Sequence, residues 1–121
     1  MVTQYKNLIN GEMVGTTDML DVVNPANEEV IGQVPACGEA ELNQAVAAAR
    51  AAFKTWSKKP IEERRKVVQA IAGVINENND ELFRLLTAEQ GKPHAQAQGE
   101  IAGAAYMAGS QATLDMDDEI N

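Results

Sequence analysis

The sequence predicts an α+β fold that is mostly helical, with β-hairpins at the N-terminus followed by three to four helices. Residues 1–37 combine short apolar stretches with turn-forming dipeptides, which is typical of strands and hairpins. Residues 38–113 carry apolar side chains at spacings of three and four, which is typical of amphipathic helices. Residues 114–121 form an acidic tail. We expect a single segment, because no internal repeat or linker-like run divides the 121 residues.

The first hairpin is predicted at Asn10-Gly11, which separates Leu8-Ile9 from Glu12-Met13-Val14. A type I′ turn needs positive φ at both central residues, and Asn and Gly tolerate it. A second hairpin is predicted for residues 20–23 and 30–34, because Pro25 and its neighbouring asparagines favour a turn between them. Two short hairpins are marginal in water, so we expect another element to pack against them.

The helical pattern begins at Glu39, and its apolar positions are Leu42, Ala45, Val46, Ala49, Ala52, Phe53 and Trp56. Pro60 suits the first turn of a second helix, which continues the apolar stripe and ends within residues 76–79. Asn78 or Asn79 is a candidate N-cap for a third helix, which should stop at Gly91. Residues 95–112 are Ala-rich and predict a fourth helix. Its glycines at 99, 103 and 109 each cost about 1 kcal/mol relative to Ala, so it should need a neighbour.

Composition excludes several classes of function. The formal net charge of −8 repels nucleic acid and anionic lipid heads. No apolar run approaches the roughly 20 residues that span a bilayer, and the N-terminus lacks the apolar stretch of a secretion signal. The single cysteine allows no internal disulfide and fits a reducing compartment. We expect a cytoplasmic protein that binds neither nucleic acid nor membranes.

Few residues in the chain could carry chemistry. Cys37 could be a thiol nucleophile with His94 as its base, but no spacing places the two together. We favour the plainer interpretation, in which Cys37 is a loop residue before a helix and His94 a surface or capping residue. Gly91-Lys92 lacks the spacing of a phosphate loop. The acidic pairs Glu62-Glu63 and Asp117-Asp118 are interpreted as solvated surface.

The three helical glycines lack the strand and the spacing of a dinucleotide fingerprint, so close helix packing is the preferred explanation for them. One His and one Cys are also too few for a zinc site. The residues therefore predict no catalytic, cofactor-binding or metal-binding site.

Several stretches together resemble the opening of an NAD(P)-dependent aldehyde dehydrogenase. They are Ile9-Asn10-Gly11-Glu12, the run from Val22 to Pro35, the run from Ala45 to Phe53 with Trp56, Pro60 with Arg64-Arg65, and the run from Leu86 to Pro93 followed by Ala97 to Ile101. The resemblance covers residues 5–105 in the order and spacing of the family.

The resemblance implies an enzyme that oxidises an aldehyde to a carboxylic acid with NAD or NADP through a cysteine thiohemiacetal. In that family the nucleophile, the base and the cofactor motifs lie beyond position 121, so the chain alone is expected to be inactive and to bind no cofactor. It would be the N-terminal part of a doubly wound cofactor domain. The resemblance also implies a possible monovalent-cation site near Val22, Val23 and Glu100, for which an ordinary surface glutamate is the alternative.

Two hypotheses of different classes therefore stay open. The first is a fragment of an oxidoreductase whose partner is the remainder of its own chain. Its exposed stripe, either Leu42, Val46, Phe53 and Trp56 or Val67, Val68 and Ile71, would favour self-association. The second is a stand-alone, non-catalytic helical module for interaction or oligomerisation.

Overall fold

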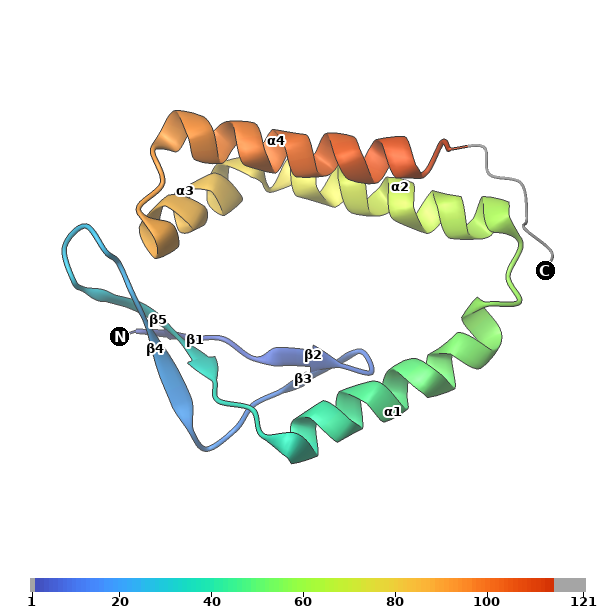
Figure 1. The fold of residues 1–121 in the computed structure, drawn as a ribbon, viewed down its shortest axis with the longest axis horizontal. Helices are drawn as coiled ribbons and strands as arrows, with labels where there is room; N and C mark the ends of the chain where they lie inside the picture. Colours follow the sequence, from blue (N-terminus) through green and yellow to red (C-terminus); the bar gives the residue numbers. More distant parts are fainter. Residues whose placement is uncertain (1, 115–121) are drawn as a thin grey trace. The chain divides into compact units, whose positions relative to one another are not determined.

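The computed structural model describes residues 2–114 and divides them into two compact units. The first unit comprises Met1–Lys58 and Ala88–Gly91, and the second comprises Lys59–Thr87 and Lys92–Asn121. All described strands and the first helix belong to the first unit, and Figure 1 shows these elements along the chain. The predicted order of hairpins followed by helices is confirmed.

The first hairpin joins β2 (Asn7–Ile9) to β3 (Glu12–Val14) in antiparallel register. Asn10 has φ 54° and Gly11 has φ 80°, which is the pair of positive angles that a type I′ turn requires. The predicted turn is therefore confirmed. Ile9, at the end of β2, is the buried residue of this hairpin.

The second hairpin joins β4 (Met19–Val23) to β5 (Val30–Pro35), as the sequence predicts. Asn24 holds its turn, because its Oδ1 accepts a hydrogen bond from the backbone N–H of Ala26 at 2.9 Å. Strand β1 (Thr3–Gln4) was not predicted; it pairs in parallel with β5 and makes a three-stranded sheet of order β1-β5-β4. Two residues are too few to show a period.

Helix α1 (Glu39–Trp56) follows the sheet and has the predicted bounds. The carboxylate of Glu41 accepts a hydrogen bond from the backbone N–H of Gly38 at 2.9 Å. This bond is one half of a capping box, and Gly38 has no side chain with which to return the other half. The helix contacts β2, yet none of its residues is buried.

The second unit is built on α2 (Ile61–Glu77) and α4 (His94–Gln111), which lie side by side (Figure 1). The neighbour that the glycine-containing fourth helix was expected to need is therefore α2. The buried residues of this unit are Ala72, Phe83, Ala97, Ala105 and Ala112. Small side chains allow two helix backbones to approach closely, but each of them buries little apolar area.

Helix α3 (Asn79–Gln90) starts and stops where the sequence indicates, and Gly91 adopts φ 71° after its last turn. The side chain of Asn78, a predicted N-cap of α3, makes a different hydrogen bond from the one expected. The Asn78 side chain donates to the carbonyl oxygen of Val74 at 2.8 Å, so it closes the end of α2 instead of capping α3.

Close helix packing, which was expected at the three glycines of α4, is confirmed at one of them and not at the other two. A Cβ on Gly109 would lie 3.8 Å from the Cβ of Ala72, which is ordinary close packing between α4 and α2. A Cβ on Gly99 or on Gly103 would meet nothing within 4 Å. Among the described residues, the close-packing explanation is therefore wrong for these two glycines.

Candidate functional site

Cys37 lies in the loop immediately before α1, with an exposed thiol. Its sulfur accepts a hydrogen bond from Nδ2 of Asn7 at 2.7 Å, so the thiol ties this loop to β2. An open hollow of about 730 Å³ lies beside it. The residues that line the hollow are Asn7, Leu8, Ile9, Cys37, Gly38, Glu39, Glu41, Leu42 and Ala45.

The charge in this hollow does not suit general-acid catalysis. The hydrogen bond from the Gly38 backbone N–H lowers the pKa of Glu41, so its carboxylate is ionised at neutral pH. A general acid needs the opposite shift, because it must hold a proton near pH 7. Glu41 therefore stabilises the start of α1 through its bond to the Gly38 backbone.

His94 begins α4 and belongs to the second unit, whereas Cys37 belongs to the first. Its ring packs edge-on against Phe83, with ring centroids 5.5 Å apart and planes at 71°. This contact could not be predicted from the sequence, because the spacing of residues 83 and 94 does not indicate it. His94 is thus a packed aromatic at a helix start.

The residues suggested for a cation site also fall in separate units. Val22 and Val23 are in β4, where the pairing with β5 is irregular, and Glu100 is in α4. The Glu100 carboxylate forms an ion pair with Nζ of Lys92. Within residues 2–114, no group of three or more His, Cys, Asp or Glu side chains could hold a metal ion. A cation at this place stays a prediction.

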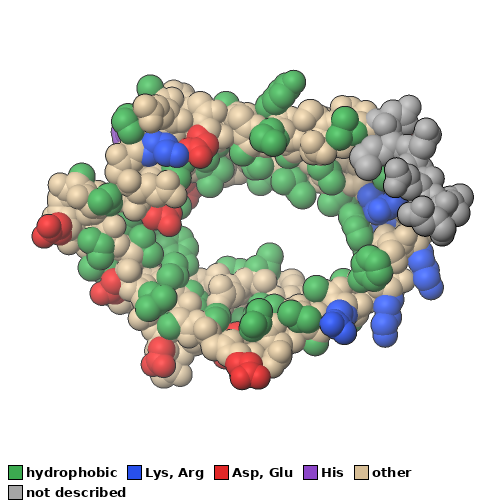
Figure 2. Space-filling view, in the orientation of Figure 1, with side chains coloured by type: hydrophobic (Ala, Val, Ile, Leu, Met, Phe, Trp, Pro, Cys, Tyr) green, Lys and Arg blue, Asp and Glu red, His purple; other side chains and the backbone are tan. Residues whose placement is uncertain are grey.

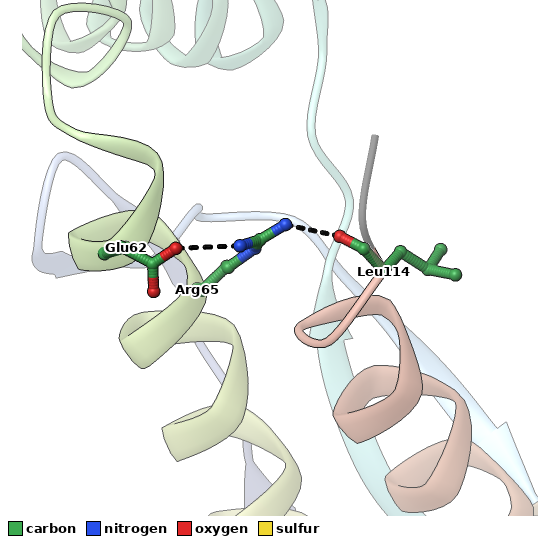
Figure 3. A network of polar contacts seen from close by, with 3 residues as sticks. All are labelled: Glu62, Arg65 and Leu114. Carbon is green, nitrogen blue, oxygen red and sulfur yellow. Dashed lines mark hydrogen bonds and ion pairs between the residues drawn. The ribbon is translucent and has the colours of Figure 1, made fainter. Parts of the chain in front are cut away.

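The acidic pair Glu62-Glu63 forms ion pairs with neighbours along the chain. Glu63 pairs with Lys59 at 3.1 Å and Glu62 with Arg65 at 2.7 Å. Arg65 also donates to the carbonyl oxygen of Leu114 at 2.5 Å, which joins the end of the described chain to α2 (Figure 3). This network is structural. The other pair, Asp117-Asp118, lies outside the described residues.

Hydrophobic side chains remain uncovered along α1 and α2, and Figure 2 shows them in green on both helices. The apolar stripe of α1 is exposed, as expected from the sequence; it includes Leu42, Val46, Phe53 and Trp56. On α2, Val67 and Ile71 are exposed while Val68 is half-buried. None of the helices in the described part of the chain is both long enough and apolar enough to span a bilayer.

Comparison with known proteins identifies the class. A crystal structure of an NAD-dependent aldehyde dehydrogenase from Sinorhizobium meliloti superposes with a TM-score of 0.88 and 32% sequence identity, over 93% of this chain and 23% of that one. A probable aldehyde dehydrogenase from a Pseudomonas species is 49% identical over 79% of this chain and 20% of its own length. Malonate-semialdehyde dehydrogenase 1 of Shouchella clausii is 40% identical over 83% of this chain and 21% of its own length.

The fold is therefore that of an aldehyde dehydrogenase segment. The model of the aldehyde dehydrogenase family matches residues 13–118, and the chain belongs to that family. It spans about a fifth of the length of the curated relatives that it matches.

Proposed function

We propose that the chain is the N-terminal segment of an enzyme that oxidises an aldehyde to a carboxylic acid with NAD or NADP. One observation carries this proposal: the family model matches residues 13–118, while the chain spans only about a fifth of its relatives. In the whole enzyme a cysteine thiolate adds to the aldehyde, a hydride leaves the thiohemiacetal for the nicotinamide, and water releases the acid. The 121-residue chain alone is inactive and binds no cofactor.

Cys37 is not the nucleophile in this proposal. Its sulfur is bound by an amide donor, and the carboxylates beside it, Glu39 and Glu41, belong to the first turn of a helix. An attacking thiol needs a base within hydrogen-bond reach, whereas the hydrogen bond to the Cys37 sulfur comes from an amide donor, Nδ2 of Asn7. The nucleophile is therefore expected in the remainder of the enzyme.

The remainder of the enzyme is also the proposed partner of the chain. The exposed apolar stripes of α1 and α2 are typical of helices that pack against a further layer of a domain. Without that layer, the stripes favour self-association. The net charge of −8 supports the proposal that the chain binds neither nucleic acid nor anionic membrane surfaces.

The alternative is a stand-alone, non-catalytic helical module for interaction or oligomerisation. The two proposals predict different DNA sequences after codon 121. A reading frame that continues to a glycine-rich strand–helix turn and a later cysteine supports the enzyme. A stop codon at that point contradicts it and favours the module.

The purified chain provides a second test. Neither NAD nor NADP should raise its melting temperature, and no aldehyde should be oxidised. A saturable rise in melting temperature would contradict the proposed lack of a cofactor site. Aldehyde oxidation that disappears in Cys37→Ser would contradict the role given to Cys37, with Asn7→Ala as the matched variant that keeps the thiol.

A further inference from the structure

The turn of the first hairpin places an asparagine before a glycine at an open position. Asn10 and Gly11 are both exposed, and a Cβ on Gly11 would meet nothing within 4 Å. Among residues 2–114, neither the Asn10 side chain nor the Gly11 backbone N–H takes part in a hydrogen bond. The side-chain amide and the next backbone nitrogen are therefore both unengaged.

The two asparagines in the turn of the second hairpin differ from Asn10. Asn24 precedes Pro25, whose nitrogen carries no proton, and its Oδ1 already accepts a hydrogen bond. The Asn27 side chain is engaged twice by Glu29: Nδ2 donates to the carboxylate at 2.9 Å, and Oδ1 accepts from the backbone N–H at 3.2 Å. Elsewhere in the sequence no asparagine precedes a glycine. Asn10 thus combines a free side chain with an unhindered neighbouring nitrogen.

We propose that Asn10 is a site of spontaneous deamidation in this chain. The backbone nitrogen of Gly11 attacks Cγ of Asn10 and closes a five-membered succinimide ring. The Cγ–Nδ2 bond breaks, and ammonia leaves with the proton that the Gly11 nitrogen gives up. Glycine favours this attack because it has no side chain to block it. Water then opens the ring at either carbonyl, so no oxidant or reductant is needed, and a base accelerates the reaction by helping to deprotonate the attacking nitrogen.

Ring opening at one carbonyl gives aspartate, and opening at the other gives isoaspartate. In isoaspartate the main chain passes through the former side chain, which adds one carbon to the loop. The connection from β2 to β3 has only the two residues Asn10 and Gly11, and both adopt the positive φ of a type I′ turn. A longer loop no longer matches the pairing of Ile9 with Glu12, next to the buried side chain of this hairpin. Isoaspartate at position 10 therefore destabilises the hairpin.

Peptide mass spectrometry of the purified, folded chain in mildly alkaline buffer tests the site. The peptide that contains Asn10 should gain the mass of an NH₂-to-OH exchange and split into aspartate and isoaspartate forms. Asn27 should react more slowly by roughly tenfold or more, because its two hydrogen bonds must first break. After the same incubation the chain should unfold at a lower urea concentration than a fresh sample.

Asn10→Gly is the matched control, because glycine keeps the positive φ of the turn and has no side chain that could cyclise. Its unfolding should not change on incubation, and a loss equal to that of the wild type would place the damage elsewhere. In urea, deamidation at Asn27 should accelerate more than deamidation at Asn10. If Asn10 reacts in urea but stays intact in the folded chain, the hairpin protects it and the proposal is wrong. An intact Asn10 under both conditions also overturns it.

Discussion

Helices α1 and α4 have the same length of 18 residues and similar alanine content, yet they are packed very differently. α4 contains Gly99, Gly103 and Gly109, which lower its intrinsic helix propensity, and α1 contains no glycine. Nevertheless α4 buries Ala97 and Ala105, with 0% and 3% of their surface exposed, whereas α1 buries nothing. A packing partner, not propensity, therefore distinguishes the two helices.

The two phenylalanines give the largest expected contrast between the units. Phe83 is 7% exposed, and Phe53 is 65% exposed. Phe83→Ala should lower the free energy of unfolding by about 3–5 kcal/mol, because it empties a packed site. Phe53→Ala should lower it by no more than about 0.5 kcal/mol in the monomer. Urea denaturation at low protein concentration measures both, and equal losses would contradict the contrast.

A change from alanine to leucine tests the same contrast in the opposite direction. Ala105→Leu adds three carbons at a closed position of α4 and should cost about 1–3 kcal/mol through overpacking. Ala51→Leu makes the same change at an exposed position of α1, outside its apolar stripe, and should change the free energy of unfolding by no more than about 0.5 kcal/mol. Thermal unfolding of the two variants compares them. A tolerated Ala105→Leu would show that the second unit is loosely packed.

Gly91 permits a smaller test within the first unit. Its φ of 71° costs an alanine about 1–2 kcal/mol, and the added Cβ would lie 3.0 Å from Cγ of Pro25. Gly91→Ala should therefore destabilise the chain by about that amount. Gly15→Ala is the matched control, because a Cβ there meets nothing and the backbone is not left-handed. If the two variants unfold at the same urea concentration, the turn after α3 contributes nothing.

Much of this architecture could be predicted from the sequence, because it depends on residues that are close together along the chain. The positive φ angles of Asn10 and Gly11, the two hairpins and the helix stop at Gly91 all follow from nearest neighbours along the chain. Strand β1 could not be predicted, since its only support is a partner about 29 residues away in β5.

The contacts between distant side chains could not be predicted either. The bond from Asn7 to Cys37 and the edge contact of His94 with Phe83 depend on tertiary placement that no local pattern encodes. The same holds for the glycines of α4, whose spacing alone does not reveal that Gly109 packs on α2 while Gly99 and Gly103 do not.

The smallest expected effect concerns pH and the start of α1. The hydrogen bond from the Gly38 N–H lowers the pKa of Glu41, so ionised Glu41 stabilises the folded chain. This contribution is complete above the ordinary pKa of a glutamate and is lost as the pH falls through the lowered value. Glu41→Gln should therefore be slightly less stable than wild type at pH 7 and equal to it in acid. Glu39→Gln shares the same first turn without this bond, and an identical pH profile for both variants would exclude the effect.

The central claim is that α4 is stabilised by packing within its own unit, whereas α1 lacks such packing. Amide hydrogen exchange of the dilute chain tests this claim most directly. The amides of α2 and α4 should exchange slowest, and those of α1 much faster, with protection of α1 rising as the protein concentration is raised. If α1 is as protected as α4 at a dilution that keeps the chain monomeric, α1 is already covered and the account is wrong.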